Sequence, residues 1–247
     1  MGVDLTWAGD RLLYARLSPA DNRPAVWALR QGQLNPEELI ANASSPRATA
    51  DGQTIVFSRA ESAGRRIARV DGDGRNVVEL GTAAGDRTSL TVDGKQLIYV
   101  SSESGTQSVW LRPLDGGKPT QLADVFGYHP APSPDGKSIA FVSVDDQRRA
   151  VISICALPDC ASRRNFPAVR SPAAVEWTPD GRGVAYAVLS NLWVQPVDGG
   201  APTQLTHLPE DGRRIEDFEW SPDGKRLALS RSKRSWDIVL FRGITPE

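Results

Sequence analysis

Ser133-Pro134-Asp135-Gly136 is the stretch that decides how this chain folds, because the sequence repeats it. It returns as Thr178-Pro179-Asp180-Gly181 and Ser221-Pro222-Asp223-Gly224, and degenerate copies are Thr49-Ala50-Asp51-Gly52 and Thr91-Val92-Asp93-Gly94. The aspartates of the five copies, taken in chain order, are 42, 42, 45 and 43 residues apart. A regular period of this length indicates an array of similar supersecondary units.

A sixth, shorter copy opens the chain at Trp7-Ala8-Gly9-Asp10, where Trp7 matches Trp177 and Trp220. Six units then fill all 247 residues as one domain and leave no room for a second. We expect the units near residues 1–41, 42–84, 85–126, 127–168, 169–210 and 211–247.

Two apolar runs recur in each unit and predict strands. After the Asp-Gly step comes a triplet such as Ile139-Ala140-Phe141, apolar at every position, which is typical of a strand covered on both faces. Further on, Val109-Trp110-Leu111 and a following Asp-Gly-Gly step are nearly restated by Leu192-Trp193-Val194 and its own Asp-Gly-Gly. Because that step supplies the positive φ of a tight hairpin, we expect Gln121-Leu122 on a fourth strand.

Each unit therefore reads as four antiparallel strands, and such a sheet cannot cover both of its faces alone. Stacking six of them radially covers both, so the predicted fold is all-β, a six-bladed β-propeller of four-stranded antiparallel blades. The nearest candidate for a helix, residues 35–41, is short. The last unit has three strands, ending near Arg242, so we expect an incomplete last blade. The corresponding hypothesis is that the chain is the C-terminal portion of a longer protein whose upstream segment supplies the missing strand.

The repeats resemble the PD40 repeat of the TolB-like six-bladed β-propellers, relatives of the WD40-type propellers, over essentially the whole chain. The segments from Ser235 to Arg242 and from Cys155 to Cys160 are similar to the C-terminal sensor propeller of bacterial winged-helix regulators and Ser/Thr kinases. The resemblance implies a non-catalytic module for protein–protein interaction or ligand sensing in a bacterial signalling or envelope protein. It also favours an extracytoplasmic or periplasmic location, although Met1 to Asp4 lack the charged-then-apolar pattern of a signal peptide.

Composition argues against several classes of partner. Lys plus Arg number 29 and Asp plus Glu number 30, so the net charge of −1 argues against nucleic-acid binding by this domain. No apolar run approaches the roughly 20 residues that span a bilayer, so no membrane span is expected. The partner implied is a protein or a peptide.

Residues for catalysis are scarce. The two histidines are His129 and His207, no Gly-x-Ser-x-Gly motif is present, and no set of residues has metal-ligand spacing. We therefore expect no enzyme activity, no metal and no cofactor. The alternatives are a lyase or hydrolase that uses the channel mouth, and a propeller that gates a separate catalytic domain. Cys155 and Cys160 flank a predicted turn and could form a disulfide or remain two reduced thiols.

The candidate binding site lies where the first strand of each unit begins, near one mouth of the central channel. Its predicted residues, expected to form a polar, mostly cationic rim, are Arg47, Arg87, Tyr128, His129, Arg170, Glu216 and Asp217. Such a rim fits a small anionic ligand, a peptide carboxy terminus or an acidic loop. The alternative is polar channel lining that contacts water. Because the tryptophans repeat with the blades, we expect them to pack between blades rather than to form a ligand cage.

Overall fold

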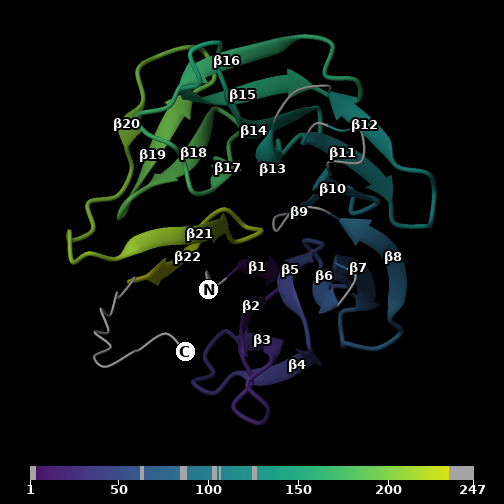
Figure 1. Ribbon diagram of the computed structural model, residues 1–247. Coiled ribbons are helices and arrows are strands. Elements are labelled where there is room, and N and C mark those ends of the chain that lie inside the picture. Colours follow the sequence, from purple (N-terminus) through teal and green to yellow (C-terminus); the bar gives the residue numbers. More distant parts are fainter. Residues whose placement is uncertain are drawn as a thin grey trace, which may run out of the picture.

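The computed structural model describes residues 4–61, 64–83, 88–101, 105, 107–123 and 127–233, and every regular element in these ranges is a strand (Figure 1). The strands form five four-stranded antiparallel sheets and a sixth sheet in which two strands are described. The first three sheets are formed by β1 (Leu5–Ala8), β2 (Arg11–Leu17), β3 (Pro24–Arg30) and β4 (Glu37–Ala41); by β5 (Ser44–Ala48), β6 (Thr54–Glu61), β7 (Gly64–Asp71) and β8 (Val78–Ala83); and by β9 (Thr88–Leu90), β10 (Gln96–Ser101), β11 (Ser108–Pro113) and β12 (Thr120–Ala123). The other three are formed by β13 (Tyr128–Pro132), β14 (Ser138–Val144), β15 (Ala150–Ala156) and β16 (Arg163–Pro167); by β17 (Val175–Trp177), β18 (Gly183–Val188), β19 (Asn191–Pro196) and β20 (Thr203–Gln204); and by β21 (Arg214–Trp220) and β22 (Leu227–Ser232).

The sheets surround a central axis as the blades of a propeller, which confirms the predicted fold class. The first strand of each sheet lies nearest the axis and the later strands lie progressively outward (Figure 1). The inner strands β1, β5, β9, β13 and β17 contact one another in this order, and β21 contacts β18 of the fifth sheet. The contact of β1 with β21 closes the ring. The third strand expected in the last repeat lies outside the described residues. Residues 37–41, within the one stretch considered for a helix, form β4.

The second strands of blades two to five supply the most completely buried runs of the core, to which third strands such as β3 and β15 add. In β14, Ile139, Ala140 and Phe141 are almost fully buried, as are the equivalent triplets of β6, β10 and β18. This burial on both faces is what the uninterrupted apolar runs predict. The equivalent run in β22, from Leu227 to Leu229, is half-buried.

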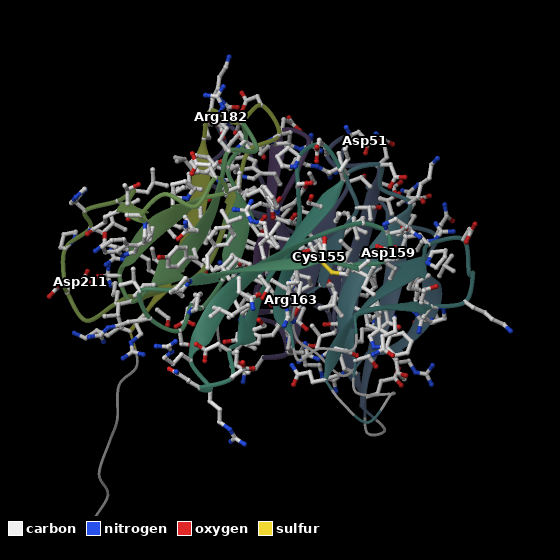
Figure 2. The ribbon with its side chains drawn as sticks, turned by 90° about the horizontal axis from the view of Figure 1, so that it is seen from above. Asp51, Cys155, Asp159, Arg163, Arg182 and Asp211 are labelled. Carbon is white, nitrogen blue, oxygen red and sulfur yellow. A yellow bond between two sulfur atoms is a disulfide. The ribbon has the colours of Figure 1, made fainter. Side chains whose placement is uncertain are left out.

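The repeated aspartates hold the turns between the first and second strands. The Ser133 hydroxyl donates to Asp135 Oδ1 at 2.6 Å, and the same oxygen accepts from the amide of Lys137 at 3.0 Å. The hydrogen bond from Ser133 is the largest of the interactions that lower the pKa of Asp135. The same pair of bonds recurs at Asp51, Asp93, Asp180 and Asp223. The carboxylates are thus turn formers, and Figure 2 shows two such turns, marked by Asp51 and Arg182, on the same face of the ring.

The cysteine pairing, which the residues left open, is resolved by the hairpin between β15 and β16. Cys155 lies in β15, its Cα is 5.0 Å from that of Cys160, and the two sulfur atoms form a disulfide (Figure 2). Asp71 is the last residue of β7, and Gly72 to Gly74 follow it in the hairpin that leads to β8.

The turn glycines give a matched pair of substitutions. Gly52 has φ +70° and Gly181 has φ +68°, a conformation that costs an L-residue roughly 1–2 kcal/mol. A Cβ on Gly52 would lie 2.8 Å from the carbonyl carbon of Ala8 in the neighbouring blade, whereas a Cβ on Gly181 would meet no atom within 4 Å. We expect Gly52→Ala to lower the urea midpoint more than Gly181→Ala, because only Gly52→Ala must also move a blade. Equal midpoints would contradict this contact between the turns of blades one and two.

Candidate functional site

The six inner strands enclose a cavity of about 300 Å³ on the propeller axis, at the end where these strands lead into the Asp-Gly turns. Each inner strand contributes to its lining. The aromatic lining residues are Trp7, Trp177 and Trp220, and the charged residues among the described lining are Arg47, Glu176 and Glu219. The cavity is therefore an apolar space with a few charged groups in its wall, the composition typical of a ligand pocket.

Arg47 on β5 lines this cavity and connects its own strand with β1, β9 and β21. Its Nε donates to the carbonyl of Thr88 at 2.8 Å, and its Nη1 donates to the carbonyls of Leu5 at 3.1 Å and Pro46 at 2.8 Å. Its Nη2 lies 3.4 Å from Asp217 Oδ2 on β21. Burial opposes the charged form of the guanidinium, but the carboxylates around it, first that of Asp217, outweigh this effect and raise the pKa of Arg47.

Two carboxylates of β21 join the last described sheet to the first. Asp217 Oδ2 accepts from the amide of Leu5 at 3.1 Å. Glu219 Oε1 accepts from the amide of Trp7 at 3.2 Å and from the hydroxyl of Thr6 at 3.1 Å. Burial raises the pKa of Glu219 to about 7, against the opposing effects of Arg47 and of the bonds from Trp7 and Thr6. The ring is therefore closed between β21 and β1 by side chains that accept bonds from backbone amides.

The structure places the predicted rim residues at different depths. Arg47 and Asp217 are buried and in contact with each other, whereas Arg170 is exposed on the loop before β17. Tyr128 and His129 are half-buried neighbours with ring centroids 5.0 Å apart, and the Tyr128 hydroxyl lies 3.5 Å from that of Ser171.

Glu216, the remaining described member of the predicted rim, is half-buried and accepts a hydrogen bond from the hydroxyl of Ser232. Arg87 lies outside the described residues. The described members of the predicted rim are thus divided between a buried ion pair that builds the ring and groups nearer its surface.

Two of the repeated tryptophans pack across blades, as their spacing predicts. Trp7 Nε1 donates to the carbonyl of Glu219 at 3.2 Å, and Trp177 Nε1 donates to that of Ala131 at 3.0 Å. Both also line the axial cavity, together with Trp220. The sequence analysis predicted that these tryptophans pack between blades but did not predict that they also line the cavity. The available signal was their place directly before the Asp-Gly turns, where each inner strand ends near the axis.

Metal-binding geometry and membrane-spanning helices were also sought in the described residues. No group of three or more His, Cys, Asp or Glu side chains in these ranges is arranged to hold a metal ion. None of the elements described there is a helix of the length and apolar character needed to cross a bilayer.

Comparisons with known proteins bear on the fold. No protein-family profile matches the sequence, and no curated protein matches it. Among solved structures, TolB from Acinetobacter baumannii superposes with a TM-score of 0.66 at 19% identity, over 94% of this chain and 54% of that one. The chain folds as a TolB-like β-propeller.

The TolB-like propeller spans about half the length of that TolB chain. A gluconolactonase from Xanthomonas campestris superposes with a TM-score of 0.69 at 20% identity, over 92% of this chain and 83% of that one. A chain of the nidogen/laminin complex does so with a TM-score of 0.65 at 12% identity, over 82% of this chain and 79% of that one. At these identities the likeness concerns the fold.

Proposed function

We propose that this propeller is a non-catalytic binding module that receives a segment of a protein or peptide partner in its axial cavity. The observation that carries the proposal is the cavity itself, a space of about 300 Å³ to which every inner strand contributes. Because the wall belongs to strands held in a closed ring, the site is formed before the partner arrives, and little ordering is needed on binding.

The charged groups at the cavity wall and next to it support a binding role over a catalytic one. Arg47, Asp217 and Glu219 each make hydrogen bonds that hold the backbone of β1. Their geometry is thus explained by closure of the ring. The nidogen/laminin neighbour, which belongs to a complex of proteins, agrees with a protein partner.

An enzyme remains the alternative, because one structural neighbour is a gluconolactonase. A direct assay separates the two functions. We expect no hydrolysis of a sugar lactone above the uncatalysed rate at any concentration of the purified chain. Turnover that scales with protein concentration would replace the binding proposal.

Selection from a displayed library of random peptides tests the binding proposal. Val92 lines the cavity and is 55% exposed, so Val92→Arg puts a large charged side chain at the rim. Val144, at the end of β14, is 40% exposed and is not part of the lining, so Val144→Arg is the matched control. We expect the selected peptides to lose at least about tenfold in affinity on Val92→Arg, or about 1.4 kcal/mol, and to be unaffected by Val144→Arg. Peptides that bind both variants like the parent would place their site elsewhere.

A further inference from the structure

We infer that the axial cavity selects a cationic side chain, a lysine or an arginine, of the peptide that it binds; this inference rests on the proposed function. It names the chemistry of the ligand that the cavity wall recognises. Three features of the described lining lead to it: the indole rings, a carboxylate oxygen without a donor, and the balance of charge.

The indole rings are the first feature. Trp7, Trp177 and Trp220 line the same small cavity, and the face of an indole attracts a cation more strongly than that of any other side-chain ring. The protein already uses this attraction, because the guanidinium carbon of Arg226 lies 4.7 Å from the ring centroid of Trp7. Arg226 is not part of the cavity lining, so this contact leaves the cavity itself available.

The second feature is the carboxylate of Glu219. Its Oε1 accepts both of the bonds from β1, and the described residues offer no hydrogen-bond donor to Oε2. Glu219 is half-buried and part of the cavity lining. An ammonium or guanidinium group that enters the cavity would therefore find a carboxylate oxygen in its wall, and bonds to charged partners are the strong ones.

The third feature is the charge of the lining. Among its described residues, Glu176 and Glu219 are acidic and Arg47 is basic. Asp217 forms an ion pair with Arg47, and three backbone carbonyls accept hydrogen bonds from the same guanidinium. The charge of Arg47 is thus compensated within the ring, and the Glu219 carboxylate leaves its part of the wall favourable to a cation.

The same geometry makes binding depend on pH. Burial raises the pKa of Glu219 to about 7, and a bound cation favours the ionised carboxylate. The charged groups that act on Glu219 are Arg47 on β5 and Asp217 on β21. Asp4 and Glu176 act in turn on Arg47. Affinity for a cationic peptide should therefore rise as the pH increases from about 6 to about 8 and level off above that, because Glu219 releases its proton over this range.

Two short peptides on the intact chain test the inference. The probes are acetyl-Gly-Lys-Gly-amide and the same peptide with norleucine in place of lysine, titrated against tryptophan fluorescence. We expect the lysine peptide to bind at least about tenfold more tightly, since a desolvated cation–π contact and a carboxylate together exceed about 1.4 kcal/mol. Glu219→Gln should remove both this preference and its pH dependence. Glu37→Gln, an exposed glutamate of β4 outside the cavity, should change neither.

Each outcome decides the inference separately from the proposed function. Equal binding of the two peptides to the parent chain overturns the cation preference and leaves the binding module standing. Binding of neither peptide also overturns it, and the library selection then judges the module alone. If Glu219→Gln unfolds the ring, as circular dichroism would show, Trp220→Leu replaces it as the variant. If folded Glu219→Gln, or Trp220→Leu in its place, still prefers the lysine peptide, the assignment of the cation site to the cavity wall is also overturned.

Discussion

Replacing Arg47 with methionine should lower the free energy of unfolding by about 3–5 kcal/mol, the usual cost of removing one partner of a buried ion pair. The side chains of Arg47 and Asp217 are 10% and 3% exposed. Loss of the guanidinium removes the cation that lies 3.4 Å from the buried Asp217 carboxylate. It also leaves the carbonyls of Leu5, Pro46 and Thr88 without donors. The urea midpoint of the intact chain measures the effect.

A second ion pair supplies the control for this prediction. Arg149 Nη2 lies 2.8 Å from Asp145, and the Arg149 side chain is 69% exposed. Arg149→Met should leave the urea midpoint unchanged, because solvent screens a pair at the surface. Combining Arg47→Met with Asp217→Asn should recover part of the loss, since the amide oxygen can still accept from Leu5 and both charges of the pair are removed. A single Arg47→Met variant as stable as the parent would show that the ring does not depend on this pair.

Truncating Phe141 to alanine should cost about 3–5 kcal/mol, because it opens a cavity in a closely packed core. Phe141 on β14 is 1% exposed and packs with Ile98, Val109 and Leu122 of the preceding blade. Its ring also reaches the backbone at Gly127, where an added Cβ would lie 2.8 Å from Phe141 Cδ2. The substitution therefore weakens the joint between two blades as well as the interior of one.

Leu34→Ala is the matched truncation for Phe141→Ala, because Leu34 is 95% exposed and loses little contact on shortening. We expect its urea midpoint to equal that of the parent. An unchanged midpoint for Phe141→Ala would contradict the placement of this side chain between blades. A loss confined to Phe141→Ala would confirm that this side chain stabilises the joint between the two blades.

Under the proposed function, closure of the ring and recognition of a partner share side chains. Glu219 bonds β1 and also lines the axial cavity, and Arg47 does the same from β5. A ligand bound in the cavity therefore contacts the groups that hold the last described sheet to the first. Because a ligand that binds only the folded state stabilises it, cavity binding should raise the unfolding midpoint of the whole propeller.

The Asp-Gly repeat carried most of the prediction of the fold, for a local reason. The turn needs a residue with positive φ and an aspartate that accepts a hydrogen bond from the amide two residues later. Both requirements are met within four or five residues of sequence. The apolar triplets are equally local, since an uninterrupted run predicts burial on both faces wherever the strand is placed. Turn, strand and period together leave radial stacking as the arrangement that covers every sheet.

The candidate site could be predicted only in part. Arg47 and Asp217 were expected at the channel mouth; the structure pairs them at 3.4 Å, and Arg47 also lines the axial cavity. Their pairing joins residues 170 positions apart, a separation across which sequence pattern carries no information. Trp7 and Glu219 were missed as lining residues for the same reason, because they come from opposite ends of the chain.

Local chemistry along the chain thus sets the blades of this protein: which residues turn, which strands are covered and how many units follow one another. Tertiary structure alone decides what lies on the axis, because each inner strand contributes only one or two residues there and their meeting depends on closure of the whole ring. The charged groups of the cavity wall, and hence the ligand that we propose for it, follow from that closure.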